Sequence, residues 1–127
     1  MIKILESDRG SAVVDFALVG PLLIGLALVV VQIGLALHVR TTLTAAAAEG
    51  ARVAAMAGSN LHIGEARARE VLRGNLAEST IDSVGVATLM ESGVGFTEVT
   101  IQAHLPLVGL LGPSVMSVHG RAIKEHV

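Results

Sequence analysis

The sequence of 127 residues contains no cysteine, no tryptophan and no tyrosine, and only two phenylalanines. Without cysteine, the chain forms neither disulfide bonds nor thiolate metal sites. Aromatic side chains supply much of the buried area of soluble cores, so their scarcity argues against a large core. The net charge of −2, with no basic patch and few aromatic rings for base stacking, also argues against nucleic-acid binding.

Apolar residues are abundant but unevenly placed. They make up 52% of the chain, and the mean hydropathy is +0.69. The run from Phe16 to Leu37, FALVGPLLIGLALVVVQIGLAL, holds 22 residues without a formal charge, and a bilayer core needs about 20. The alternative, a buried core helix, would need a soluble domain large enough to surround it, which the rest of the chain does not easily supply. The run therefore predicts a membrane-spanning helix.

A secretory signal peptide is the other alternative for this segment. Signal peptides have an apolar stretch of roughly 7–15 residues followed by a small-residue cleavage site. Here the stretch is longer, and residues 32–40 (QIGLALHVR) contain no A-x-A exit. We therefore expect the segment to remain in the mature protein.

The residues before the apolar run contain an unexpected charge. A short segment, Met1–Gly10, precedes Ser11, and Asp15 stands at the edge of the run. A carboxylate there is costly unless it has a partner. If the chain were cut after Gly10, the new amine of Ser11 would lie on the same helix face as Asp15, four residues on. Alternatively, Asp15 is solvated in the headgroup region and interacts with the helix dipole.

The run RGSAVVDFALVGPLL resembles the class III signal of type IV pilins and pseudopilins, and more narrowly the TadE-like proteins of tight-adherence pili. The resemblance continues through LALHVRTTLTAAAAEGARVAAMAG and again at LPLVGLLGP. It implies that a prepilin peptidase cuts between Gly10 and Ser11, and that Asp15 is the acidic fifth mature residue, followed by Phe16. The family more often has Glu at this position; Asp15 keeps the charge but shortens its reach.

Four residues of the predicted membrane helix differ from its large apolar side chains. Pro21 removes a backbone hydrogen bond and bends the axis, and Gln32 is the only strongly polar side chain of the run. Gly25 and Gly34 permit close helix approach but form no GxxxG motif within the run, so they also fit ordinary membrane-helix glycines.

The basic residues predict the orientation of the chain in the membrane. Lys3 and Arg9 precede the helix, whereas Arg40 follows it. The positive-inside rule then places the N-terminus in the cytoplasm and the C-terminal part outside it.

The sequence predicts three regions: a leader over 1–10, a membrane-spanning and extended helix over 11–58, and a small extracytoplasmic head over 59–127. Eight of the thirteen residues 45–57 are alanine, which favours continuation of the helix until Gly58-Ser59-Asn60 ends it. This alanine-rich stretch packs either against other subunits or against the chain's own head, and both alternatives remain open.

The head is expected to be α+β, with one short helix across one face of a three-stranded antiparallel sheet. The helix is predicted over 63–76, with an apolar stripe and with surface ion pairs of the kind also expected between Glu49 and Arg52. Strands are predicted over 84–90, 96–105 and 115–124, with a hairpin turn over 91–95. The predicted stripe consists of Ala66, Val71, Leu72 and Leu76, and the predicted ion pair of this helix joins Glu65 to Arg69.

No set of residues predicts catalysis, a cofactor or a metal site. The five histidines (His38, His62, His104, His119 and His126) lack ligand spacing. His104 and His119 stand on strands predicted to be neighbours, but isolated surface histidines fit this pattern better than a metal pair.

The sequence thus favours a minor pilin or pseudopilin that contributes to assembly of tight-adherence type IV pili, with no enzymatic activity. By resemblance, its partners are the lipid bilayer, a prepilin peptidase, other pilin-like subunits and the pilus assembly platform, and it enters a cell-surface pilus or assists its assembly. The alternatives are a pseudopilin of a related secretion system and an uncleaved structural single-pass membrane protein.

Overall fold

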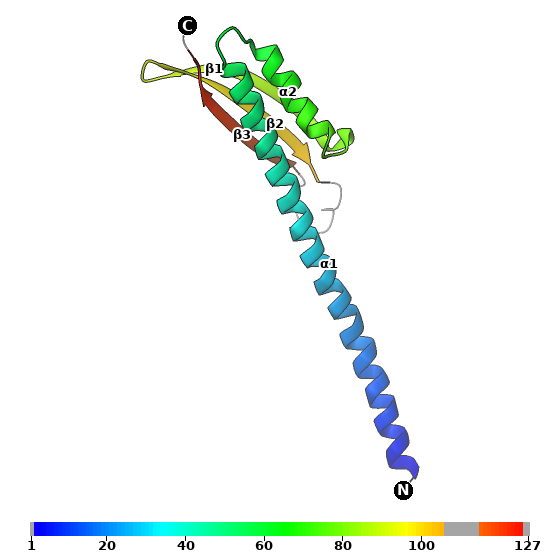
Figure 1. Cartoon of the computed structure of the whole chain (residues 1–127). Coiled ribbons are helices and arrows are strands. Elements are labelled where there is room, and N and C mark those ends of the chain that lie inside the picture. Colours follow the sequence, from blue (N-terminus) through cyan, green and yellow to red (C-terminus); the bar gives the residue numbers. More distant parts are fainter. Residues whose placement is uncertain (1, 106–114, 126–127) are drawn as a thin grey trace. The chain divides into compact units, whose positions relative to one another are not determined.

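The computed structural model describes residues 2–105 and 115–125, with side chains from Asp8 onward. Two helices precede a short 3₁₀ turn and three strands (Figure 1), which confirms the predicted α+β class. The elements are α1 (Ile2–Ala55), α2 (Leu61–Arg73), η1 (Glu78–Thr80), β1 (Ile81–Glu91), β2 (Val94–His104) and β3 (Val115–Ile123). The chain divides into two compact units, Met1–Leu35 and Ala36–Val127.

The three strands form one antiparallel sheet in the order β1-β2-β3, as predicted. β1 starts three residues earlier than expected, at Ile81, and an irregularity in its pairing lies between Ile81 and Ser83. The alternation of β2 is confirmed: Val99, Ile101 and Ala103 are buried, whereas the side chains between them are more exposed. The sheet therefore has one apolar face and one polar face.

The hairpin between β1 and β2 turns in two residues. Glu91 pairs directly with Val94, so that only Ser92 and Gly93 remain between the strands. Both have a positive φ, 53° and 83°, as a type I′ turn requires. The turn predicted over 91–95 is present but shorter, because Val94 and Gly95 already belong to β2.

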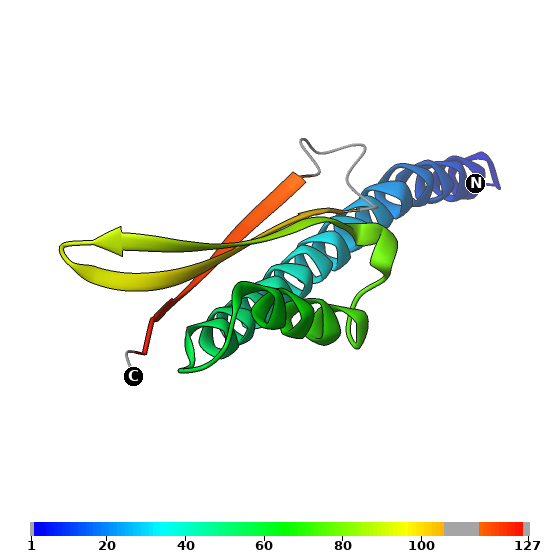
Figure 2. The ribbon, with the colours of Figure 1, turned by 90° about the horizontal axis from the view of Figure 1, so that it is seen from above.

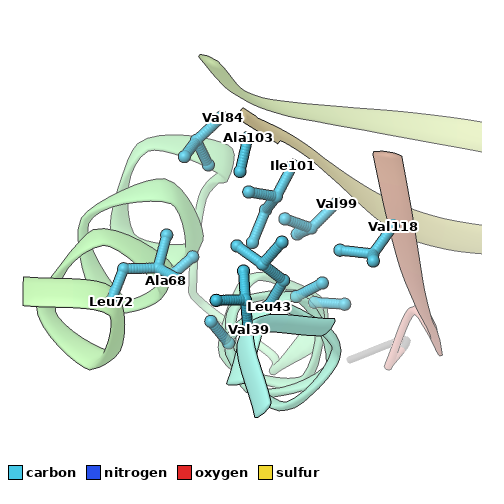
Figure 3. Packing of buried hydrophobic residues seen from close by; sticks show 12 residues of the cluster. Val39, Leu43, Ala68, Leu72, Val84, Val99, Ile101, Ala103 and Val118 are labelled. Carbon is cyan, nitrogen blue, oxygen red and sulfur yellow. The ribbon is translucent and has the colours of Figure 1, made fainter. Parts of the chain in front are cut away.

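The core lies between the sheet and the two helices (Figure 3). Leu43 of α1 is fully buried and lies close to Val99 and Ile101 of β2, and Leu72 of α2 is a fully buried member of the same cluster. Among the described residues, seven of the fourteen buried apolar side chains are alanine. Half the core thus consists of a residue that contributes little area per side chain, which agrees with the small core expected from the lack of aromatic residues.

The buried face of the alanine-rich stretch packs against the chain's own head. Val39, Leu43, Ala47 and Ala51 recur at helical spacing and are buried in the core that the sheet completes. Ala45 and Ala48, on other faces, are exposed. The alanine-rich stretch was expected to pack either against other subunits or against the chain's own head. For its buried face, the structure shows packing against the head.

Small residues allow α1 and α2 to approach closely. A Cβ on Gly64 would lie 2.3 Å from the Cβ of Ala54, and a Cβ on Gly50 would lie 2.9 Å from the Cβ of Ala68. Each helix therefore presents two small residues spaced by four, Gly50 and Ala54 on α1 and Gly64 and Ala68 on α2. A larger side chain at either glycine would push the helices apart.

α2 confirms the predicted second helix, with different bounds. It begins at Leu61, two residues earlier than expected, because the Asn60 side chain accepts a hydrogen bond from the Ile63 amide at 3.0 Å. It ends at Arg73 rather than Leu76. The predicted place of Ala66 in the buried stripe is wrong: Ala66 is exposed, and the buried line runs through Gly64, Ala68 and Leu72.

Within the unit Ala36–Val127, α2 and the last part of α1 lie on the same face of the sheet (Figure 2). The hairpin of β1 and β2 reaches past both helices, and residues 87–94 at its end are all exposed. The other face of the sheet carries Glu98, Thr100, Gln102 and His104 of β2, as predicted.

Candidate functional site

The predicted processing junction lies on the surface of α1. Gly10, Ser11 and Asp15 are all helical and exposed. Ser11 and Asp15 are four residues apart, which puts them on one face of the helix. In the uncut chain the Ser11 nitrogen belongs to a peptide bond, so the pairing with Asp15 requires cleavage and remains a prediction.

Gly10 has no packing role in the described structure. A Cβ added there would meet no atom within 4 Å, and its helical conformation does not need glycine. Ala is the better helix former by about 1 kcal/mol. Local folding therefore does not explain a glycine at this position.

Most of the apolar run that follows is exposed. α1 is long and apolar enough to cross a membrane, judged by length and composition, and its most apolar window is 0% buried. Phe16, next to Asp15, is 79% exposed. An apolar surface of this extent is unfavourable in water, so it requires lipid or other apolar helices around it.

Four residues of the apolar helix were singled out from the sequence, and the structure does not bring them together into a site. They are Pro21, Gly25, Gln32 and Gly34. α1 continues without interruption through Pro21. A Cβ at Gly25 or Gly34 would meet nothing within 4 Å, so their small size serves no contact within the described part of the chain. The Oε1 atom of Gln32 is buried and, among the described residues, accepts no hydrogen bond.

An ion-pair network links α1 to α2 on the head. Glu49 accepts hydrogen bonds from Arg52 at 2.8 and 2.9 Å, as the sequence predicted, and from Arg67 of α2 at 3.4 Å. Arg67 also contacts Glu70 at 2.9 Å. The hydrogen bonds from Arg52, supported by Arg67, lower the pKa of Glu49 to about 2. The sequence did not predict Arg67 as the link between the helices, because the two residues belong to different elements.

The second predicted pair of the head is also confirmed, since Arg69 donates to Glu65 at 3.1 Å. This pair lies within α2 and joins no second element.

The four described histidines are partly or fully exposed and stand on four different elements. His104 Nδ1 lies 2.7 Å from an Asp82 carboxylate oxygen, and His119 Nδ1 lies 3.0 Å from the Thr100 hydroxyl. β-Sheet register places His119 opposite Thr100, four residues along β2 from His104. The described residues contain no group of three His, Cys, Asp or Glu side chains that would hold a metal ion. His126 lies outside the described residues.

A family model matches part of the chain. Residues 10–52 match the family model described as TadE-like protein. The chain is TadE-like over this segment. The TadE-like segment begins at Gly10, contains the whole apolar run and ends at Arg52, within the part of α1 that packs on the head. No curated protein and no solved structure gave a significant match.

The match confirms the resemblance stated for the N-terminal part of the sequence and connects the chain with the tight-adherence pilus system. The second stretch of resemblance, LPLVGLLGP, is not part of the TadE-like segment, and all but its first residue lies outside the described residues.

Proposed function

We propose that this chain is a pilin-type subunit, a minor pilin or pseudopilin, that contributes to assembly of tight-adherence pili. The observation that carries the proposal is the TadE-like match over residues 10–52, which starts at the residue before the predicted cut and covers the apolar helix. The long exposed apolar surface of α1 supports it, because such a surface suits a bilayer and lateral contact with other apolar helices.

In this proposal the leader, residues 1–10, lies in the cytoplasm and is removed by a prepilin peptidase between Gly10 and Ser11. Residues 11 to about 40 hold the chain in the membrane, with the head outside the cytoplasm. The freed amine of Ser11 then pairs with Asp15, in the same subunit or in a neighbour. Other pilin-like subunits and the membrane platform of the pilus machine are the partners.

The test is the intact mass of the protein purified from membranes of its own host. We expect the mass to be lower by that of residues 1–10, and we expect Gly10→Val to restore the full-length mass. The matched control is Gly25→Val, a second exposed glycine of α1 where a Cβ meets nothing within 4 Å; this variant should still be cut.

A full-length wild-type chain in a host with an active prepilin peptidase would contradict the proposal and favour an uncleaved single-pass membrane protein. Cleavage together with genomic neighbours of another export apparatus would favour the related secretion system instead.

A further inference from the structure

One arginine of the head differs from the others in having no carboxylate partner among the described residues. The chain has six arginines from residue 36 onward. Five of them have a guanidinium nitrogen between 2.5 and 3.6 Å from a glutamate oxygen, namely Arg52, Arg67, Arg69, Arg73 and Arg121. The sixth, Arg40 of α1, is exposed, and no described residue forms an ion pair with it. Its charge is therefore available to an anion outside the described head.

The polar side chains next to Arg40 on α1 already use their hydroxyl hydrogens within the helix. Thr44, four residues on and hence on the same helix face, donates its hydroxyl to the Arg40 carbonyl at 2.8 Å. Thr41 donates its hydroxyl to the Leu37 carbonyl at 2.8 Å. Among these three side chains, only the guanidinium of Arg40 remains as a donor for an anion.

The apolar run determines the depth at which Arg40 would lie in a membrane. Its 22 residues, 16–37, extend over about 33 Å at a rise of about 1.5 Å per residue, enough to cross a hydrocarbon core of about 30 Å. Arg40 follows Leu37 by about 4.5 Å along the helix axis. Because the headgroup layer on each side of the core is about 5–8 Å thick, the guanidinium would lie within this layer, where the lipid phosphates are.

We propose that Arg40 binds the phosphate group of a membrane phospholipid, on the side of the bilayer that the head occupies. This inference rests on the proposed membrane anchoring of α1. The planar guanidinium donates two parallel hydrogen bonds to phosphate oxygens, and the opposite charges strengthen them. The contact would fix the depth of α1, since deeper insertion would bring a charged side chain into hydrocarbon.

Lys124 provides a comparison, because it too forms no ion pair with a described residue and yet lies far from the apolar run. Its amide donates to the Gly95 carbonyl, and the amide of the next residue, Glu125, donates to the carbonyl of Ala55. Ala55 follows Arg40 by fifteen residues of α1, or about 22 Å. A headgroup layer of about 5–8 Å does not extend that far.

Solid-state NMR measures the proposed contact directly. The full-length chain, labelled with ¹³C-arginine, is reconstituted in phospholipid vesicles in a phosphate-free buffer. It carries Arg9→Lys, so that the six arginines of the head are the labelled ones. We expect lipid ³¹P to dephase the guanidinium carbon of one arginine, and Arg40→Lys to abolish this effect. Arg52→Lys, which replaces a guanidinium that Glu49 already binds, is the matched control and should leave the effect unchanged.

Two outcomes of this measurement would overturn the proposal: the absence of dephasing, and dephasing that persists in the Arg40→Lys chain. A further sample separates lipid from free phosphate. In vesicles of a galactolipid, which contains no phosphorus, inorganic phosphate in the buffer should not dephase the Arg40 carbon. Dephasing as strong as in phospholipid would assign the site to free phosphate and exclude the lipid.

The depth of the helix gives an independent readout, because the chain has no cysteine. An environment-sensitive fluorophore is attached at Ala45→Cys, an exposed position of α1. Arg40→Leu should shift its emission to shorter wavelength, since the helix can then insert more deeply. Lys124→Leu, which also removes a positive charge, is the control and should leave the emission unchanged. Equal emission from the Arg40→Leu and unsubstituted chains would contradict a role of Arg40 in setting the depth.

A second label distinguishes failure of this inference from failure of the membrane anchoring. Ala27→Cys places the fluorophore at an exposed position within the apolar run. Emission typical of lipid at residue 27, without dephasing of the Arg40 carbon, would overturn the phosphate contact alone. Emission typical of water at residue 27 would overturn the membrane anchoring as well. The vesicles contain no prepilin peptidase, so neither result depends on leader cleavage.

Discussion

At the scale of single residues, the smallest side chains determine how the head packs. A Cβ on Gly120 of β3 would lie 2.4 Å from the Ala47 carbonyl carbon and 2.6 Å from the Ala48 nitrogen. These are backbone atoms and cannot rotate away as a side chain can. The sheet and α1 therefore touch at a point where only glycine fits, opposite an alanine.

We predict that Gly120→Ala destabilises the head by about 1–3 kcal/mol, the usual range for overpacking. The matched control is Gly85→Ala in β1, where the nearest atom to an added Cβ is 4.0 Å away; it should change stability by less than about 0.5 kcal/mol. Hydrogen exchange of the β3 amides in the full-length chain measures both values. Equal protection in the two variants would contradict the contact between Gly120 and Ala47.

Asp15 leads to a prediction about function. If its carboxylate pairs with the Ser11 amine after cleavage, Asp15→Asn removes the charge while the helix and the junction remain. We expect normal removal of the leader but roughly tenfold weaker co-purification with other pilin-like subunits, given the usual value of a hydrogen bond to a charged group. Asp15→Glu, which keeps the charge, is the control. An unchanged yield of the complex with Asp15→Asn would favour the solvated alternative.

At the scale of elements, the α1–α2 pair combines close backbone approach with one ionic link. The glycines bring the helices together, and Glu49 and Arg67 connect them at the surface of the contact. Since the pKa of Glu49 is about 2 in the folded head and about 4.3 in an unfolded chain, the link depends on pH in a defined direction.

The depressed pKa means that the folded state binds the Glu49 proton less readily than the unfolded state does. Stability from this group is therefore fully present above about pH 4.3 and is lost as the pH falls towards about 2. We expect the unfolding temperature of the head to fall across this window. Glu49→Gln should remove part of that pH dependence and lower the unfolding temperature at pH 7; Glu70→Gln, whose carboxylate contacts Arg67 only within α2, should do so less. Equal profiles for Glu49→Gln and the wild type would contradict the role of Glu49.

The elements themselves could be predicted because their signals are local. Alternation along β2 depends on neighbouring residues, and so does the alanine-rich continuation of α1. The buried line of α2 could not be predicted in the same way. Gly64 is buried only because Gly50 and Ala54 of α1 lie against it, and nothing in the sequence around Gly64 marks a glycine as a packing residue.

At the scale of the whole molecule, the N-terminal segment could be interpreted from the sequence without tertiary contacts, whereas the packing of the head could not. The junction and the apolar run lie within one continuous segment, so their pattern is readable without tertiary contacts, and the TadE-like match falls on the same residues. The row of Leu89, Phe96 and Ile123, on the sheet face away from the helices, was not predicted, because it depends on the register of three strands. Single apolar residues at strand ends give no signal in the sequence.

The contact between Gly120 and Ala47 also sets the order of events during synthesis. The alanine-rich part of α1 is made early, yet β3, which lies against it, is made almost last. The head therefore cannot close until nearly the whole chain has left the ribosome, because such long-range contacts form only when both partners are present. Until β3 has been made, the face of α1 around Ala47 lacks the strand that covers it in the folded head.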